Sequence, residues 1–380
     1  MFEQIFDLIR SQYAEAQIPL HEPRFVGHER DYLQQCIDST LVSSVGPFVG
    51  RFEEAVAAFT GSRHAIAVVN GGQALLLALK LAGVAPGSEV LTQSLTFVAT
   101  ANAVAHCGAA PVFLDVDPQT LGLSPDALAA FLDTHAERRD GRLINRESGR
   151  EIHACLPMHT CGHPCRIDEL AALCADYNLP LVEDAAESLG SYRDGRHTGT
   201  FGRLGILSFN GNKIVTTGGG GMILTDDEHL AIRARHLSTT AKLPHPYEFI
   251  HDAIGYNFRL PNLNAALGLA QLEQLPRFLA DKRALAALYR DGLRDLPLTF
   301  VDEPPGCLSN FWLNTILFDR IADKENFLEQ ANAQGIMARS LWRPMHLLEI
   351  YRDARRGELP VTEDLYRRAV NLPSSVRRAP

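Results

Sequence analysis

The chain has 380 residues, of which 46% are hydrophobic and 21% are charged, as is typical of a globular protein with a sizeable core. This composition excludes extensive disorder, and the length predicts two or three domains, or one large domain with an appendage. With 36 Lys and Arg against 45 Asp and Glu, the net charge of −9 argues against nucleic acid or an anionic membrane surface as a partner. A small anionic ligand is not excluded, because a few local donors can bind one.

The first residues predict no signal peptide, because acidic residues interrupt them and no basic segment precedes an apolar run. They predict a short amphipathic helix with Phe2, Ile5, Phe6 and Ile9 on one face. The uncharged stretch 90–114 contains Gln, Asn, His and Pro, so it predicts buried strand and helix segments rather than a membrane span. Seven cysteines, an odd number, without a secretory signal predict free thiols and a cytoplasmic location.

From residue 63 onward, short apolar runs alternate with helical patterns. The predicted strands are 64–69, 89–93, 111–114, 152–156, 180–183, 204–209 and 222–225. The predicted helices between them are 75–81, 97–107, 125–132 and 167–177, and the charged block 139–151 is expected to be an exposed excursion. Such alternation predicts an α/β fold with a mostly parallel sheet covered by helices on both faces, and with ligands at the carboxyl ends of the strands.

The pattern changes after residue 255, where longer helical segments dominate. Two long helices are predicted at 263–275 and 278–293, then a strand at 311–318 and a helix at 323–334. We therefore expect a second, smaller α+β domain. The expected division is a helical N-terminal extension at 1–18, a large domain at 19–254 and a small C-terminal domain at 255–380.

Four potential metal ligands lie within seven residues: His159, Cys161, His163 and Cys165. In one extended strand they would all point the same way, but Gly162 and Pro164 break such a strand. The spacing also differs from that of a structural zinc site. We therefore expect no metal, and interpret the segment as a loop at the end of the strand 152–156.

Two polar segments follow strands of the predicted sheet. The segment 70–73 (NGGQ) stands between a strand and a helix, where glycines and a helix N-terminus can bind an anion. A tight structural turn is an equal alternative for this segment. Asp184 ends the strand 180–183, so its carboxylate either faces the ligand crevice or caps the following helix.

Two further segments carry unusual polar residues. Lys213 is the only charged residue between positions 204 and 224, where it stands among small polar residues and a run of four glycines. An amine shielded from water loses its proton more readily, and an imine-forming amine must be unprotonated. The alternative is a solvated lysine at a hairpin tip. The segment 255–266 is a polar entry to an apolar helix.

One chemistry uses all of these parts. A Schiff-base lysine, an aspartate opposite a pyridinium nitrogen, a phosphate cradle and an aromatic wall together describe a pyridoxal 5'-phosphate site. The aspartate keeps the ring nitrogen protonated, so that the ring can accept electrons from a substrate carbanion.

At these residues the sequence resembles the sugar aminotransferases of the DegT/DnrJ/EryC1/StrS type. The resemblance extends from residue 19 to about 375 and is strongest in the segments 42–52 (VSSVGPFVGRF), 92–100 (TQSLTFVAT), 182–190 (VEDAAESLG), 208–221 (SFNGNKIVTTGGGG) and 255–272 (GYNFRLPNLNAALGLAQL). It implies fold type I of the pyridoxal-phosphate-dependent transferases, which is aspartate-aminotransferase-like, with a large domain built on a mostly parallel mixed sheet and a small α+β C-terminal domain.

The resemblance also implies catalytic roles, residue by residue. Lys213 would form the Schiff base with the cofactor and shuttle the proton, and Asp184 would pair with the pyridine nitrogen. Phe97 would stack on the ring. Glu187 stands where the family usually has Gln; it could touch the 3-oxygen of the ring, although a carboxylate beside that anionic oxygen is unfavourable unless protonated or turned away.

Phosphate binding is implied for a second group of residues. Gly72 and Gln73 would offer backbone N–H groups and Ser208 its hydroxyl, although the family commonly has Thr in place of Gly72. Asn257 would reach the phosphate from the neighbouring subunit, so that a homodimer shares its active sites. Candidate residues for the substrate's phosphates and sugar are Lys242, Arg259, Arg343 and His346, each of which has a surface, salt-bridge or structural role as its alternative.

The implied reaction is a ping-pong transfer with pyridoxamine phosphate as the intermediate cofactor form. L-Glutamate would supply the amino group and leave as 2-oxoglutarate, and C4 of a nucleotide-diphosphate 4-keto-6-deoxy (N-acetyl)hexosamine would receive it. The segments 18–27 and 157–169 look most like the branch that leads to legionaminic acid or N-acetylbacillosamine in bacterial surface glycans, and this branch favours UDP.

Three other functions compete with that of a sugar aminotransferase. Sugar 3-deoxygenation on the same scaffold uses His in place of the lysine, so Lys213 argues against it. The intact set of Lys213, Asp184 and Ser208 disfavours a non-enzymatic pyridoxal-phosphate-binding protein. A Rossmann dinucleotide enzyme would need G-x-G-x-x-G after the first strand, which the segment 70–75 does not supply.

Overall fold

The computed structural model describes residues 1–378. Its α-helices are α1 (Phe2–Arg10), α2 (Glu29–Asp38), α3 (Pro47–Thr60), α4 (Gly71–Leu81), α5 (Val98–His106), α6 (Pro125–His135), α7 (Ile167–Asp176), α8 (Glu228–Ser238), α9 (Asn262–Gly292), α10 (Ile321–Ala333) and α11 (Pro360–Arg368). Its strands are β1 (His64–Val68), β2 (Glu89–Gln93), β3 (Ala110–Leu114), β4 (Ala136–Arg139), β5 (Arg142–Asn145), β6 (Ile152–Leu156), β7 (Val182–Asp184), β8 (Tyr192–Arg193), β9 (Arg196–His197), β10 (Leu204–Ser208), β11 (Gly221–Thr225), β12 (Leu298–Phe300), β13 (Cys307–Leu308), β14 (Asn314–Phe318), β15 (Arg339–Ser340) and β16 (Ala369–Leu372).

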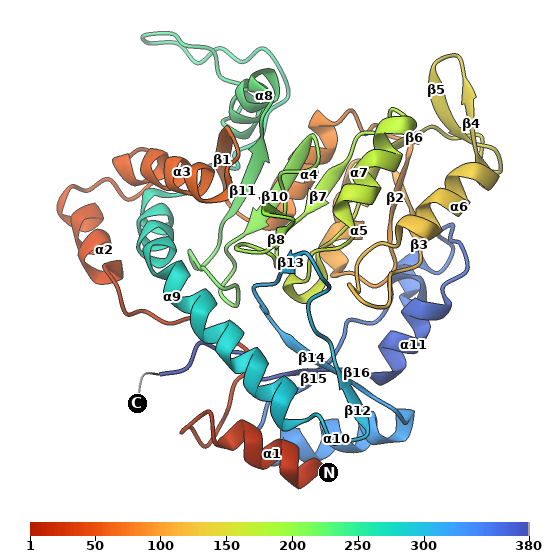
Figure 1. The fold of residues 1–380 in the computed structure, drawn as a ribbon. Coiled ribbons are helices and arrows are strands. Elements are labelled where there is room, and N and C mark those ends of the chain that lie inside the picture. The colour runs from red at the N-terminus through yellow and green to blue at the C-terminus, as the bar shows by residue number, and fades with distance from the viewer. Residues whose placement is uncertain (379–380) are drawn as a thin grey trace.

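A large mixed sheet forms the upper part of the molecule in Figure 1, with helices on both faces. Strands β3, β2 and β6 pair in parallel, and β7, β10, β11 and β1 continue the sheet through parallel bridges from Cys155 to Leu181 and from Met158 to Asp184. Strand β11 alone runs opposite to the other strands of this sheet. This arrangement confirms the predicted mostly parallel sheet, and it places the ends of β7 and β10 side by side.

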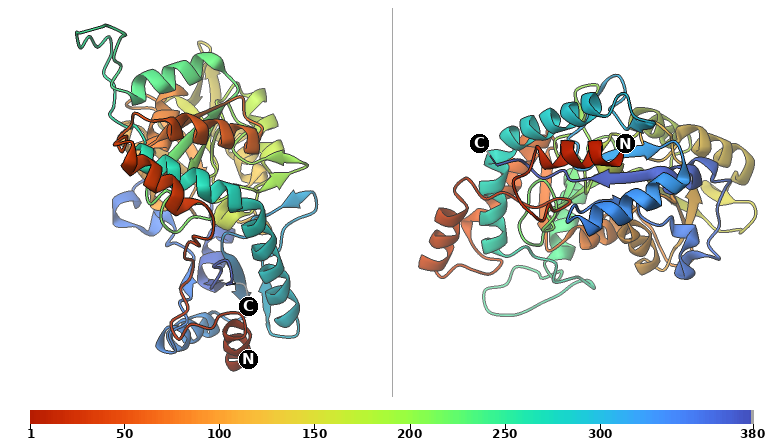
Figure 2. Two further views of the ribbon diagram at one scale, coloured as in Figure 1. Left: turned by 90° about the vertical axis from the view of Figure 1, so that its left-hand side faces the viewer. Right: turned by 90° about the horizontal axis from the view of Figure 1, so that it is seen from below.

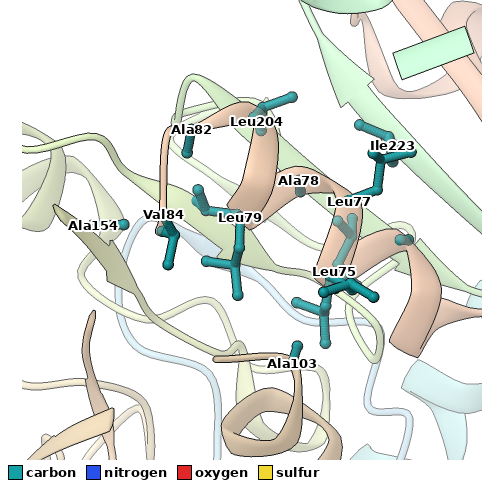
Figure 3. Packing of buried hydrophobic residues seen from close by; sticks show 14 of the residues in the cluster. Leu75, Leu77, Ala78, Leu79, Ala82, Val84, Ala103, Ala154, Leu204 and Ile223 are labelled. Atoms are coloured by element: carbon teal, nitrogen blue, oxygen red, sulfur yellow. The ribbon is translucent and has the colours of Figure 1, made fainter. Parts of the chain in front are cut away.

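The core of the large part forms where α4 covers the sheet (Figure 3). Leu75, Leu77 and Leu79 project from α4 toward residues of β10, β11 and α5, and all three are buried. Leucine and alanine dominate the sequence of α4, which suits both helix formation and close packing on a sheet.

Truncation of this core is expected to cost stability. Leu79→Ala should lower the free energy of unfolding by about 2–5 kcal/mol, because it removes buried methyl groups and leaves a cavity. Ile232→Ala on α8 is the matched control, since the Ile232 side chain is 62% exposed and its truncation should change stability by less than about 0.5 kcal/mol. Chemical denaturation of both variants measures the difference, and equal values for the two would contradict the packing described.

A smaller antiparallel sheet, in the order β12-β14-β16-β15, lies at the lower end of the molecule (Figure 1). The predicted amphipathic helix is confirmed as α1, and its apolar face packs into the core of this part: Ile5, Phe6 and Ile9 are buried, and Phe6 stacks on Phe327 of α10 at 5.3 Å. The N-terminal helix, expected to be an extension, thus shares a hydrophobic cluster with the C-terminal part.

Helix α9 corrects the prediction of two separate helices at 263–275 and 278–293. It is one helix of 31 residues that runs through Pro276. Its first half packs against α2 and α3 of the large part, and Leu285 and Tyr289 of its second half pack with α1 and the small sheet. Packing on both sides of Pro276 offsets the loss of one helical hydrogen bond. The helix therefore joins the two parts directly.

Other boundaries differ by a few residues. The strand predicted at 311–318 begins at Asn314, because Phe311 has a left-handed backbone with φ of 45°. The charged block 139–151 includes part of a hairpin formed by β4 and β5. All seven cysteines are unpaired in the structure. No helix in the described residues is long and apolar enough to span a membrane.

An arm formed by residues 242–254 projects from the large part between α8 and α9 (Figure 2). Leu243 N–H donates to the carbonyl of Ile250 at 2.8 Å, so the arm folds back on itself. Tyr247, Phe249 and Ile254 on the arm are 82%, 80% and 91% exposed. Large apolar side chains on such a projection are typical of an interaction surface.

Candidate active site

A cavity of about 340 Å³ lies at the carboxyl ends of β7 and β10, beside the start of α4. Its lining combines predicted site residues with aromatic side chains from the C-terminal part: Gly72, Phe97, Asp184, Glu187, Ser208, Lys213, Trp312 and Trp342. Residues distant in the sequence therefore meet in one cavity, as expected for the ligand crevice of an α/β sheet.

Asp184 ends β7 and is only 2% exposed. Its Oδ2 accepts a hydrogen bond from Thr100 Oγ1 at 2.7 Å, and its Oδ1 accepts one from the Ala186 amide at 3.2 Å. Burial raises the pKa of the Asp184 carboxyl, and the hydrogen bonds and more distant charges of Lys213 and His159 act in the opposite direction. Asp184 makes no ion pair within residues 1–378, so a protonated pyridine nitrogen would supply its missing counter-charge.

Lys213 lies in the loop between β10 and β11, and its side chain is 12% exposed. Its Nζ lies 3.2 Å from Glu187 Oε1 and 4.1 Å from the centroid of the Trp312 ring. The indole N–H of Trp312 donates to the carbonyl of Asn212 at 2.8 Å, which fixes the ring beside the lysine. Lys213 is thus a largely buried amine in the cavity and not a solvated hairpin tip.

The turn between β1 and α4 forms one wall of the cavity. Asn70 caps α4, and its Oδ1 accepts the Gln73 amide at 2.8 Å. A Cβ added at Gly71 would lie 2.9 Å from Ser208 Cβ, so only glycine permits this approach of the helix to β10. The helix N-terminus and the Ser208 hydroxyl line the cavity together and can hold a phosphate. The Gln73 amide is expected to donate to the phosphate, but in this structure it already donates to the Asn70 side chain.

Comparison with known proteins now decides the family. Residues 24–379 match the model of the DegT/DnrJ/EryC1/StrS aminotransferase family. The chain belongs to this family. The predicted resemblance, fold and enzyme class are therefore confirmed: the protein is a pyridoxal-phosphate-dependent sugar aminotransferase of fold type I.

Alignments with named relatives cover nearly the whole of this aminotransferase. EpsN of Bacillus subtilis (strain 168), whose name assigns it provisionally to the pyridoxal-phosphate-dependent aminotransferases, is 38% identical over 94% of this chain and 91% of its own. GDP-perosamine synthase of Caulobacter vibrioides is 36% identical over 94% of this chain and 93% of its own. The crystal structure of the aminotransferase TlmJ from Streptoalloteichus hindustanus superimposes with a TM-score of 0.85 at 30% identity, over 94% of this chain and 93% of TlmJ.

Glu187 finds two partners in the aminotransferase. Besides Lys213, its Oε2 accepts the Cys161 amide at 2.9 Å. Burial raises the pKa of Glu187 to about 7, against the lowering effects of Lys213 and the Cys161 hydrogen bond. A carboxyl with this pKa exists in both protonation states near neutrality, so it can stand beside an anionic oxygen as a donor or beside Lys213 as a counter-ion.

Glu187 is expected to make stability depend on pH. Its folded-state pKa lies above its unfolded value of about 4.5, so ionisation in the folded protein costs free energy. As the pH rises from about 4.5 to 7, the stability of the wild type relative to Glu187→Gln should therefore fall by on the order of 3 kcal/mol. Above pH 7 this difference should stay level. Thermal unfolding of both proteins between pH 5 and 8 measures this difference, and a difference independent of pH would contradict the assignment.

The segment 157–165 lies directly beneath the site as a loop with one 3-10 turn at Thr160–Gly162. His159 Nε2 lies 3.0 Å from Glu183 Oε2, and the contacts with Cys165 and Glu183 raise the pKa of His159 to about 10 despite its burial. Burial lowers the pKa of His163 to about 4. Within residues 1–378, no group of three or more His, Cys, Asp or Glu is placed to hold a metal ion. His159 thus links the loop that carries the Cys161 amide to Glu183 of β7.

The other predicted binding residues lie outside the cavity. Asn257 and Arg259 are exposed near the base of the arm, where Arg259 Nε donates to Asn257 Oδ1 at 3.0 Å. Lys242 lies on the arm over Phe249. Arg343 is exposed, and His346 is buried with its Nδ1 2.7 Å from Ser94 Oγ and its Nε2 3.7 Å from Glu363. None of these five residues lines the cavity that holds Lys213.

Three residues of the site were missed in the sequence. Thr100 lies in the segment 92–100 that carries the family resemblance, and its position three residues after the start of the predicted helix gave no sign that it contacts Asp184. Trp312 and Trp342 come from the C-terminal part, at 99 and 129 residues from Lys213 by their numbering. The one available signal was that these are the only two tryptophans in the chain.

Proposed function

We propose that this aminotransferase moves the amino group of L-glutamate to C4 of a nucleotide-linked 4-keto-6-deoxy sugar. The observation that carries the proposal is that Lys213 and Asp184 line one cavity, together with Trp312 and Trp342 of the C-terminal part. When bound, pyridoxal phosphate supplies a ring that accepts the electrons left on carbon after a proton is removed.

The side chains around that ring have separate tasks. Asp184 would hold the ring nitrogen in its protonated form, and the hydrogen bond from Thr100 orients its carboxylate. Lys213 would hold the cofactor covalently and, once released, would move a proton at the reacting carbon. Glu187 holds the lysine amine before the cofactor arrives. Ser208 and the start of α4 would hold the phosphate, and Phe97, which also lines the cavity, would stack on the ring.

The sugar is proposed from the resemblance and from the relatives. The resemblance favours a UDP-linked N-acetylhexosamine on the route to legionaminic acid or N-acetylbacillosamine. Relatives that are 33–36% identical carry the name GDP-perosamine synthase, which supports a GDP-linked sugar instead. A further relative, 33% identical over 74% of this chain, is named a spore coat polysaccharide biosynthesis protein, which supports a role in surface polysaccharide synthesis.

A homodimer with shared active sites is part of the proposal. The arm exposes Tyr247 and Phe249, and Asn257 lies at its base without contact to the cavity of its own chain. A second copy would bury these apolar side chains and bring Asn257 toward the neighbouring phosphate site. We also propose a cytoplasmic location, which the seven unpaired cysteines support.

Product analysis tests the function. The loaded protein is incubated with L-glutamate and, in separate reactions, UDP- or GDP-linked 4-keto-6-deoxy sugars with and without a 2-acetamido group. Mass spectrometry of the sugar should show exchange of the keto oxygen for an amino group with one of the four, together with 2-oxoglutarate. If the protein aminates keto acids but none of the four sugars, the sugar assignment is contradicted.

A further inference from the structure

A second, outer cavity of about 750 Å³ adjoins the cavity of Lys213. The two share four lining residues: Phe97, Asn212, Trp312 and Trp342. A bound cofactor would occupy the inner cavity, because Lys213, Asp184 and Ser208 line it. The outer cavity would therefore receive the part of a substrate that does not react, while the reacting part lies near Lys213.

The two cavities differ in charge. Carboxylates line the inner one, where Asp184 and Glu187 surround Lys213. No Asp or Glu lines the outer cavity among residues 1–378, and its one Lys or Arg is Arg339. The Arg339 side chain makes no ion pair or hydrogen bond with any described residue and is exposed. The outer cavity thus presents a guanidinium with all of its donors available.

The backbone beneath Arg339 is held firmly on both sides. Arg339 lies in β15, directly opposite Asn371 of β16, and Asn371 also lines the cavity. Asn371 Oδ1 accepts from Thr315 Oγ1 at 2.7 Å, which fixes that side chain. On the other edge, the Met337 amide donates to the carbonyl of Ile18 at 2.9 Å. Because the backbone of Arg339 is already fixed, only its side chain loses conformational entropy when a ligand binds.

Two further polar groups of the outer cavity have no partner. The Oγ of Ser340 and both ring nitrogens of His21 are buried without a hydrogen bond to any described residue. Buried polar groups normally have partners, and an unpaired one costs free energy. Both groups line the same cavity as Arg339, so a polar ligand bound there would supply the missing hydrogen bonds.

We propose that Arg339 is the anion anchor of the substrate cavity, where its guanidinium binds an oxyanion group of the substrate and Ser340 and His21 add hydrogen bonds. This inference rests on the proposed function. The oxyanion is either a carboxylate of the amino donor or the diphosphate of the nucleotide sugar, since a guanidinium binds both in a bidentate manner. In a ping-pong transfer the two substrates enter the same cavity in turn.

Tryptophan fluorescence offers a direct test, because both tryptophans of the chain line this cavity. The cofactor-loaded full chain is titrated with glutarate as the carboxylate probe and with UDP and GDP as diphosphate probes, none of which can react. Arg339→Met should weaken binding of at least one probe about tenfold or more, with Arg339→Lys in between. Arg320→Met is the control, because Arg320 is an exposed arginine of the same part that lines neither cavity.

The outcomes separate the sources of the anion. Loss of glutarate binding alone assigns Arg339 to the amino donor, loss of UDP or GDP binding alone assigns it to the nucleotide sugar, and loss of both assigns it to each substrate. Wild-type affinity in Arg339→Met, an equal loss in Arg320→Met, or no binding of any probe to the wild type would overturn the proposal.

Failure of the anchor and failure of the function are distinguishable. Amino transfer to a 4-keto sugar in Arg339→Met with unchanged KM values for both L-glutamate and the sugar would contradict the anchor and leave the proposed function standing. If probe binding depends on Arg339 but the protein aminates no sugar, the proposed function is contradicted and the proposed anchor still stands.

Discussion

Lys213→Ala should abolish amino transfer and the visible absorbance of the bound cofactor. Lys213 is the lysine of the inner cavity, and its amine lies beside Glu187 and Trp312 in the position from which it can reach a bound ring. Without it the cofactor loses its covalent attachment and the reacting carbon loses its proton carrier. Loss of general acid–base catalysis alone lowers a rate by about 10²–10⁴-fold. Steady-state kinetics with glutamate, and an absorbance spectrum of the purified variant, measure both effects.

Two variants separate the covalent role of Lys213 from its charge. Lys213→Arg keeps a cation opposite Glu187 and over Trp312 but cannot form the bond, so it should be as inactive as Lys213→Ala. Lys80→Ala at the end of α4 removes a lysine that does not line the cavity, and should keep full activity. Substantial activity in Lys213→Arg would contradict the covalent role.

Asp184→Asn should lower kcat by about 10²–10³-fold, the size expected when one electrostatic contact to the reacting system is removed. The amide can keep the hydrogen bond with Thr100 but cannot hold a proton on the ring nitrogen, so the ring accepts electrons less readily. The spectrum of the bound cofactor should change as well, because its ring nitrogen is then unprotonated. Rapid-mixing kinetics of the glutamate half-reaction measure the loss.

Stability distinguishes this effect from misfolding. Burial raises the pKa of Asp184, which means that the folded protein disfavours its charge. Asp184→Asn without cofactor should therefore be at least as stable as the wild type in thermal unfolding. A large drop in the unfolding temperature, with a matching loss of activity, would show that Asp184 serves the fold and not the reaction.

The strands and the residues at their ends were predictable from the sequence, because a buried parallel strand leaves an apolar run and its carboxyl end carries polar residues. Asp184, Ser208 and Lys213 follow this rule, and the structure brings them into one cavity. Local patterns sufficed here because each residue lies within a few positions of the strand that places it.

Residues from the C-terminal part could not be placed in this way. Trp312 and Arg339 reach the cavities only because α9 continues through Pro276 and sets the small sheet against the large one. That geometry depends on packing at both ends of a helix, which a local pattern does not contain. The same limit applies to Glu187, whose partner Lys213 lies on a different strand connection. The role of Asn257 in a dimer remains a prediction, as do the roles of Lys242, Arg259, Arg343 and His346 toward the substrate.

The most direct test of the central claim is to locate the cofactor on the chain. The loaded protein is reduced with borohydride, which makes the link between lysine and cofactor permanent, then digested and mapped by mass spectrometry. The account predicts one modified peptide, with the cofactor on Lys213. A cofactor attached to another lysine, or none attached to a protein that still transfers amino groups, would contradict it.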